Sequence, residues 1–232
     1  TSPWPCLKGF QQVQGPERMS KLKDVGAVGS SPVLNEGACV DQFSSLTAAP
    51  SETLHFPSLN RRRLTTLQVN LGYRCNQSCS HCHVNAGPWR KEMMSRELID
   101  LIPEVLARLE LSCLDLTGGA PELHPNFCEL VSSARDRGVE VIDRCNLTIL
   151  SEPGQDHLAG FLADHGVRVV ASLPCYEQER VDLQRGQGVY ERSIAGLKRL
   201  NDLGYAQPGS PLQLDLVFNP SGASLPPAQG PL

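Results

Sequence analysis

The sequence has no long apolar run and no excess of charge of one sign. None of its apolar stretches approaches the roughly 20 residues that a membrane-spanning helix needs, and its beginning lacks the apolar core of a signal peptide. The 232 residues include 21 Lys and Arg against 25 Asp and Glu, and the basic residues are dispersed. This balance gives no reason to expect nucleic acid or a membrane as a partner. We therefore expect a cytoplasmic protein.

The first part of the chain lacks sustained hydrophobic periodicity. Residues 1 to about 55 are punctuated by Pro, Gly and Ser, without the repeat of a helix or of a strand. Such a segment cannot bury enough apolar surface to offset the entropy cost of ordering it. We expect residues 1–58 to be a disordered or loosely ordered leader and residues 59–232 to form the core domain.

The chain does have nine cysteines, and three of them are crowded into one polar loop. Cys75, Cys79 and Cys82 have the spacing C-x3-C-x2-C and directly follow a strand-like run. Three thiolates can hold a 4Fe-4S cluster, which normally takes four cysteines, if one iron is left open for a substrate. An odd and uneven set of cysteines points to metal binding in a reducing compartment rather than to disulfides.

Three other interpretations fit the same loop. His83 could join the cysteines in a Cys3His zinc site. The run from Cys79 to His83 also reads C-x-x-C-H, the attachment pattern of c-type haem, although it leaves Cys75 without a role and would need export. Reduced structural cysteines are the third interpretation, and they usually sit in apolar surroundings, whereas this loop is polar. The spacing alone leaves these alternatives open.

Strand-like and helix-like segments alternate from residue 64 onward. The expected strands cover residues 66–72, 113–117, 139–145, 167–173 and 212–218. The expected helices cover residues 95–109, 125–137, 155–165 and 190–203, and Gly138, Gly166 and Gly204 close the last three. This alternation predicts an α/β fold with parallel strands and right-handed crossovers. It does not choose between an open doubly wound sheet and a barrel.

Two parts of this pattern carry specific expectations. Ser95 is the expected N-cap of the first helix. The apolar positions of that helix are Leu98, Leu101, Ile102, Val105 and Leu109. The connection formed by residues 174–188 is longer than a normal crossover loop, and loops of that length are often functional.

At the cysteine loop the chain resembles the radical S-adenosylmethionine (SAM) superfamily, whose cluster loop has this spacing with an aromatic-type residue, here His81, before the third cysteine. Further segments narrow the resemblance to the arsenosugar biosynthesis radical SAM proteins. They are residues 67–72, 81–88, 117–122, 143–148 and 173–176. The resemblance runs from about Phe56 to the C-terminus and implies a partial (β/α)6 TIM-like barrel. Because only five strands are found, it also implies that the last strand and a C-terminal region are missing from this sequence.

The resemblance implies a 4Fe-4S cluster held by Cys75, Cys79 and Cys82, with SAM bound at the open iron. The residues that it assigns to SAM are His81, Thr117, Gly118, Gly119, Ala120, Pro121, Arg144, Asn146 and Ser172. Glycines let the backbone approach a ligand closely. The commoner loop of the family reads Gly-Gly-Glu-Pro, whereas this chain has Ala120 and places Glu122 after the proline. The departure puts Glu122 in doubt as a ligand more than the loop itself.

One face of the expected strands is unusually polar. It carries Gln68, Asn70, Asp115, Thr117, Ser172, Gln213 and Asp215. An ordinary closed barrel is filled by branched apolar residues, so this face predicts a wet interior that holds a polar ligand. The alternative for Asp115 and Asp215 is a structural role with hydrogen bonds to their neighbours.

On the substrate side, Cys145, Cys175 and Tyr176 lie at the ends of expected strands or directly after them. Trivalent arsenic is thiophilic, and the hypothesis is that one or both cysteines hold a methylated arsenical beside the cluster. Their burial as small apolar side chains is the alternative. In the family resembled, an external donor reduces the cluster, SAM is cleaved to a 5′-deoxyadenosyl radical, and the radical adds to the arsenical. A radical SAM enzyme that modifies a peptide or another metabolite and a zinc-binding structural module remain the rival functions.

Overall fold

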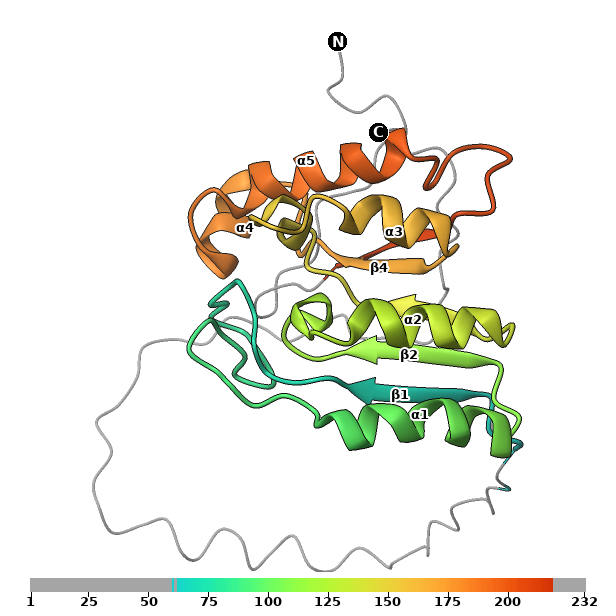
Figure 1. Ribbon diagram of the computed structural model, residues 1–232. Helices are drawn as coiled ribbons and strands as arrows, with labels where there is room; N and C mark the ends of the chain where they lie inside the picture. Colours follow the sequence, from blue (N-terminus) through green and yellow to red (C-terminus); the bar gives the residue numbers. More distant parts are fainter. Residues whose placement is uncertain (1–59, 61, 219–232) are drawn as a thin grey trace, which may run out of the picture. The chain divides into compact units, whose positions relative to one another are not determined.

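The structure is a computed structural model that describes residue 60 and residues 62–218. The strands in this part of the chain are β1 (Thr66–Asn70), β2 (Cys113–Thr117), β3 (Glu140–Asp143), β4 (Arg168–Ser172) and β5 (Leu214–Val217). The helices are α1 (Arg96–Arg108), α2 (Phe127–Asp136), α3 (Leu158–Asp164), α4 (Gln178–Arg185) and α5 (Val189–Asp202), with short 3-10 helices η1 (Pro121–Leu123) and η2 (Thr148–Ser151) (Figure 1). The expected leader of residues 1–58 lies outside the described residues.

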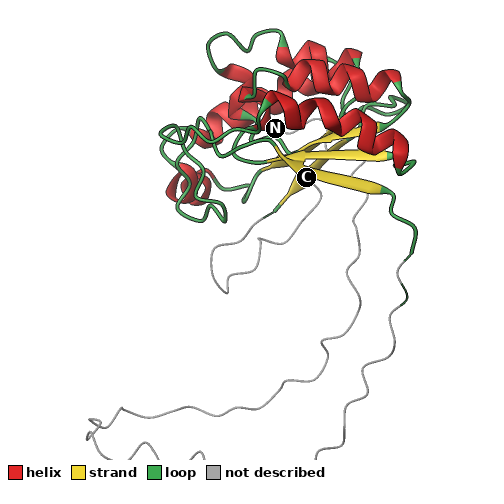
Figure 2. Cartoon of the chain, turned by 60° about the horizontal axis from the view of Figure 1, so that its bottom comes forward, coloured by secondary structure: helices red, strands yellow, loops and turns green. Residues whose placement is uncertain are grey.

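All five strands form one parallel sheet in the order β1-β2-β3-β4-β5. Each strand pairs with the next strand of the sequence, and at least one helix lies between them in the chain. Figure 2 shows helices gathered on one face of the sheet. This arrangement confirms the predicted α/β fold and matches the first five units of a partial TIM-like barrel.

The core lies between the sheet and its helices. A row of side chains in register crosses this helix-covered face, from Val69 through Leu116, Asp143 and Val169 to Leu214. All five side chains are buried. Four of them are apolar, as expected for a buried parallel sheet, and the single carboxyl group in the row needs a separate explanation.

The opposite face of the sheet, which we call the open face, is polar as predicted. Its in-register neighbours include Gln68 with Asp115 on β1 and β2. Gln68 Nε2 donates to Asp115 Oδ2 at 2.8 Å. On β4 and β5, Arg168 Nε donates to Asp215 Oδ2 at 2.7 Å. Both aspartates therefore have the hydrogen-bonded structural role that was their alternative interpretation.

Of the expected apolar positions of α1, only Ile102 is buried. Leu98 and Leu101 are 52% and 49% exposed, whereas the buried residues of the helix are Ile99, Ile102 and Leu106. Both sets repeat at about the helical period, so the sequence pattern alone does not separate them. Packing against the sheet selects the set with spacing i, i+3 and i+7.

The connection of residues 174–188 is largely a helix, α4, rather than a long loop. Its residues are good helix formers, but only Val181 is a buried aliphatic residue, and Leu183 is 87% exposed. A helix with so little apolar surface leaves no periodic signal in the sequence.

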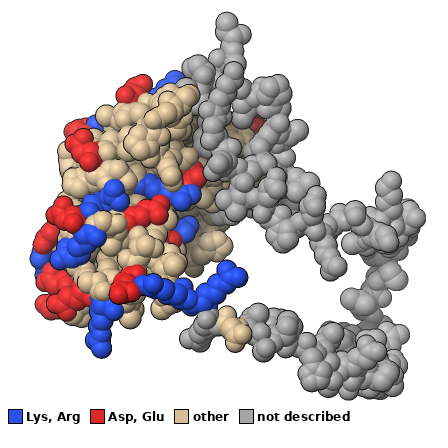
Figure 3. All heavy atoms as spheres, turned by 90° about the vertical axis from the view of Figure 1, so that its right-hand side faces the viewer, with Lys and Arg blue, Asp and Glu red and all other residues tan. Residues whose placement is uncertain are grey.

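The edge at which the strands begin carries charges of both signs, intermingled (Figure 3). Arg63 pairs there with Glu110, and Arg168 Nη1 lies 3.8 Å from Glu140 Oε1. Within the described residues, no helix combines the length and the apolar character that crossing a bilayer requires.

Candidate cluster site at the carboxyl ends of the strands

The cysteine loop begins directly after β1 and is anchored by backbone bonds at its base. Cys75 N donates to the carbonyl of Gly87 at 3.2 Å, and Gly87 N donates to the carbonyl of Tyr73 at 3.1 Å. Backbone N–H groups also point at two of the sulfurs. Gln77 N lies 3.4 Å from Cys75 Sγ, and Ala86 N lies 3.3 Å from Cys82 Sγ. Such donors stabilise thiolates and therefore suit metal ligands.

The three sulfurs of the loop are not gathered as tightly as a single zinc ion requires. Four thiolates around one zinc ion lie about 3.8 Å apart, because each Zn–S bond is about 2.3 Å. Among the described residues, one set of three metal-ligating side chains has all its donor atoms within 4.8 Å of one another, and the three loop cysteines are not that set. His83, the expected fourth zinc ligand, is exposed. The residues present therefore fit a multi-iron cluster.

Burial sets the protonation of these thiols in the metal-free chain. It raises the pKa of Cys75 to about 11 and also raises the pKa of Cys79. Both thiols are therefore neutral near pH 7 until a metal displaces the proton. His81 in the same loop is partly buried, and its Nδ1 has no hydrogen-bond partner among the described residues. Burial lowers the pKa of His81, which keeps the ring neutral.

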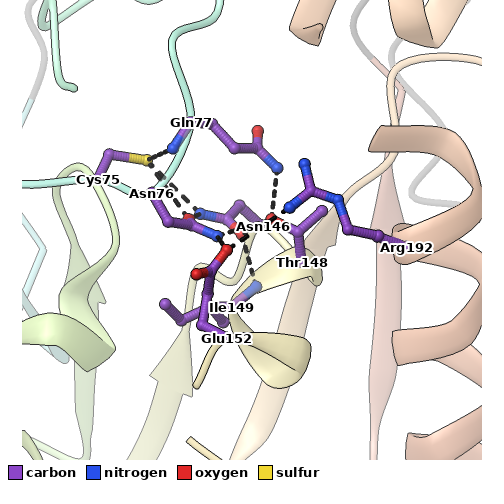
Figure 4. Close-up of polar contacts among 8 residues, drawn as sticks. All are labelled: Cys75, Asn76, Gln77, Asn146, Thr148, Ile149, Glu152 and Arg192. Atoms are coloured by element: carbon purple, nitrogen blue, oxygen red, sulfur yellow. Dashed lines mark hydrogen bonds and ion pairs between the residues drawn. The ribbon is translucent and has the colours of Figure 1, made fainter. Parts of the chain in front are cut away.

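A network of side-chain amides attaches the loop to the end of β3 (Figure 4). Asn146 Nδ2 donates to Asn76 Oδ1 at 2.8 Å and approaches Cys75 Sγ at 3.6 Å. Thr148 Oγ1 accepts from Asn76 Nδ2 at 2.9 Å and from Gln77 Nε2 at 2.8 Å. The amide group of Asn146, expected to bind SAM, is thus engaged with the cysteine loop, and its SAM contact stays a prediction.

The loop after β2 packs against the base of the cysteine loop. Gly119 N donates to the carbonyl of Gly72 at 3.0 Å, and Ala120 N donates to the carbonyl of Arg74 at 2.9 Å. A side chain at Gly119 would place its Cβ 2.4 Å from the Arg74 carbonyl oxygen. The first glycine, Gly118, has a φ of +142°, which other residues rarely adopt. This loop therefore requires glycine for its backbone contacts, before any ligand is considered.

Glu122 lies in the core instead of facing a ligand. Its carboxylate belongs to a buried group with Asp143 and Cys145, whose donor atoms all lie within 4.8 Å of one another. None of the four carboxyl oxygens has a hydrogen bond of ordinary geometry among the described residues, but the two carboxyl groups and the Cys145 thiol lie close enough to act on one another. Burial raises the pKa of both carboxyl groups, and at Asp143 the charge of Glu122 adds to the rise. A proton on one group lets it donate to the other, which is how such pairs remain buried.

Cys145 has the surroundings of its alternative interpretation, burial as a small side chain. Its side chain is fully buried and lies with Glu122 and Asp143, and Asp143 belongs to the helix-covered row. Burial raises the pKa of the Cys145 thiol well above its ordinary value. This placement suits a small core side chain and not a ligand for a substrate on the open face.

Replacing Asp143 with Asn should stabilise the chain more at alkaline than at acid pH. The folded state of the natural chain holds protons that the unfolded state releases above about pH 4. The pair Glu122–Asp143 therefore stabilises the fold at low pH, and this contribution is lost as the pH rises. The amide introduced at position 143 can donate its N–H to Glu122 even when both natural carboxyl groups would have lost their protons. A hydrogen bond to a charged acceptor contributes about 1.5–3 kcal/mol.

Urea unfolding at about pH 5 and about pH 8 measures this effect, since both values lie above the pKa of about 4 that a carboxyl group has in the unfolded chain. The advantage of Asp143→Asn over the natural chain should grow between them. Asp136→Asn, at the exposed end of α2, is the matched control and should change little. Equal pH dependence of Asp143→Asn and the natural chain would contradict the shared proton.

The other expected ligands have different surroundings. Arg144 lies on the open face, where its Nε and Nη2 each donate to Asp115 at 2.8 Å, so its guanidinium is already paired. Ser172 ends β4 and is partly buried. Cys175 is only 3% exposed. The ring of Tyr176 lies 6.2 Å from that of Phe218.

Sequence reasoning missed the residues that hold the cysteine loop in place. Asn76, Gln77 and Thr148 form the amide network, and Asn76 Nδ2 also donates to Glu152 Oε1 at 2.8 Å. Arg185 is buried at the end of α4. Their partners lie about 70 or more positions away, so no local pattern marks them.

Comparison with known proteins agrees with this geometry. Among curated proteins, the chain is 28% identical over 157 residues to a probable GTP 3′,8-cyclase of Pyrococcus horikoshii and 27% identical over 159 residues to one of Saccharolobus solfataricus. These alignments cover 67% and 68% of this chain, but 47% and 49% of the relatives. The chain thus spans about half the length of the curated relatives that it matches.

Solved structures give the same fold. Histidine-tagged anSMEcpe with bound AdoMet has a TM-score of 0.53 at 16% identity, over 67% of this chain and 43% of that chain. Streptococcus suis SuiB bound to the precursor peptide SuiA has a TM-score of 0.51 at 16% identity, over 61% of this chain and 31% of that chain. The family model of the radical SAM superfamily matches residues 69–210. Because this match covers more than half of the sequence, the chain belongs to the radical SAM superfamily, which uses a 4Fe-4S cluster and SAM.

Proposed function

We propose that this chain is the radical SAM part of an enzyme that attaches the adenosyl group of SAM to a methylated trivalent arsenical. The observation that carries the radical chemistry is the cysteine loop at the carboxyl edge of the sheet, with Gly119 packed against its base. When bound, the cluster and SAM supply a 5′-deoxyadenosyl radical, with an electron from an external donor. The arsenical is supported by the resemblance of residues 117–122, 143–148 and 173–176 to the arsenosugar biosynthesis proteins.

In this proposal the chain binds and orients its ligands with residues from several strand ends. Cys75, Cys79 and Cys82 hold the cluster. The methionine part of SAM lies against the loop of Thr117, Gly118, Gly119, Ala120 and Pro121, with His81 and Ser172 completing the site. Cys175 binds the arsenical through its thiol, and Tyr176 next to it helps to exclude water.

A cyclase acting on GTP is the second candidate, favoured by the names of the curated relatives. A triphosphate is usually bound by arginine or lysine side chains that are free to donate to it. On the open face near the carboxyl ends of the strands, the guanidinium group of Arg144 is already paired with Asp115. This pairing favours a substrate without phosphate groups.

The test is anaerobic reconstitution with iron and sulfide, followed by incubation with SAM, a reductant and dimethylarsinous acid. Mass spectrometry should detect a 5′-deoxyadenosyl arsenical, and a parallel incubation with GTP should give no 3′,8-cyclised product. A cyclised nucleotide would establish the second candidate instead. Release of 5′-deoxyadenosine with neither product would refute the arsenical and leave a peptide or another metabolite as substrate. Bound zinc without SAM cleavage would refute the radical chemistry itself.

A further inference from the structure

Arg185 is a buried charge that the proposed function does not use. It is the last residue of α4 and is only 7% exposed. Its Nε has no hydrogen-bond partner among the described residues. Burying a cation is costly unless an opposite charge faces it. The position of Arg185 therefore calls for an anionic partner.

Arg185 lies beside the cluster loop. When ionised, Cys79, Cys75 and Cys82 interact with its charge, Cys79 most strongly, and the charge also reaches His81 in the same loop. The backbone brings the two segments together next to Arg185. Ser80 donates to the carbonyl of Gln184 both from its N, at 3.1 Å, and from its Oγ, at 3.2 Å. The end of α4 is thus bonded to the middle of the cluster loop.

The helix that carries Arg185 is itself fixed in place. The carboxylate of Asp182 accepts from Gly188 N at 3.1 Å and from Tyr190 N at 2.9 Å. These bonds attach α4 to the first turn of α5. Arg185 therefore sits on a short helix anchored at two points, and its charge stays beside the cysteines.

A fixed positive charge has a definite effect on an iron-sulfur cluster. Reduction adds one electron, so the reduced cluster is more negative than the oxidised cluster. A nearby cation in a water-poor environment stabilises the reduced state more, and net charge is one of the factors that set cluster potentials. The higher potential makes the cluster easier for its donor to reduce.

We propose that Arg185 is a positioning residue whose fixed charge raises the reduction potential of the cluster held by Cys75, Cys79 and Cys82. The proposal rests on the cluster ligands of the proposed function, but it is independent of the substrate. It assigns Arg185 to the electron-transfer step rather than to the binding of SAM or of the arsenical.

The test is a redox titration of the reconstituted chain, followed by the electron paramagnetic resonance signal of the reduced cluster. Arg185→Met removes the charge and keeps most of the side-chain volume. We expect the equilibrium constant for one-electron reduction to fall at least about tenfold, which corresponds to about 59 mV. Arg185→Lys keeps the charge and should stay close to the natural potential. Arg180→Met, on the exposed side of the same helix, is the matched control and should leave the potential unchanged.

Several outcomes would overturn the proposal. They are an unchanged potential in Arg185→Met, an equal shift in the Met and Lys variants, and a loss of SAM affinity with no change in potential. If Arg185→Met fails to hold iron while Arg185→Lys holds it at the natural potential, the requirement for charge is supported. Loss of iron from both variants would instead assign Arg185 a packing role. Absence of a cluster signal from the natural chain would show that the proposed cluster, and not the role of Arg185, has failed.

Discussion

Replacing Cys79 with Ser should reduce the iron content of the reconstituted chain from about four irons to background. Cys79 is the loop cysteine whose ionised form interacts most strongly with the buried charge of Arg185, and its thiol is only partly buried. A hydroxyl group is a harder and far less acidic ligand than a thiol, so it cannot replace the thiolate. SAM cleavage, measured as release of 5′-deoxyadenosine, should be lost together with the iron and the brown colour.

Cys128→Ser is the matched control for this prediction. Cys128 is also a free, partly buried cysteine, but it lies in α2, outside the loop. It should keep the full iron content, because its thiol has no part in the site. Full iron in Cys79→Ser, or equal loss in both variants, would show that the loop does not hold the cluster.

Replacing Gly119 with Ala should destabilise the chain and also lower its iron content. The new Cβ would lie 2.4 Å from the carbonyl oxygen of Arg74, the residue immediately before Cys75. This neighbour is backbone, so relief of the clash must move the start of the cluster loop. Overpacking of this kind typically costs about 1–3 kcal/mol. Urea unfolding measures the stability, and iron analysis after reconstitution measures the displacement of the loop.

Gly160→Ala separates this effect from the general consequences of losing a glycine. Gly160 lies inside α3, and a Cβ there would meet nothing within 4 Å. Because alanine is the better helix former, this variant should gain about 0.5–1 kcal/mol and keep its iron. If Gly119→Ala has natural stability and iron content, the close packing of the two loops is not required for the site.

Much of the fold could be predicted from local patterns. The alternation of strand-like and helix-like segments predicted a parallel sheet, and the sheet formed in sequence order. Helix ends were less accurate: α2 and α3 begin at Phe127 and Leu158, each a few residues after the expected start. Helix α4 was missed because its buried residues are Val181, Gln184 and Arg185 rather than an apolar stripe.

The candidate site, too, could be predicted only where it depends on residues that are close in the sequence. Three cysteines within eight residues stay close together in any fold, because they are near neighbours along the chain. This closeness points to a metal site. The contacts that hold this loop are not covalent neighbours. Thr148 reaches Asn76 and Gln77 across more than 70 positions, and Glu122 meets Asp143 because β2 and β3 pair.

What the residues alone determined is therefore the place of a crowded cysteine loop suited to a metal, the alternation of parallel strands with helices and the polarity of one sheet face, since each depends on spacing along the chain. Which apolar face of α1 is buried, where Cys145 points and what surrounds Arg185 depended on packing between distant segments. The physical reason is that a period or a motif specifies a local shape, whereas burial and the partner of a charge are set by the residues that the folded backbone brings alongside.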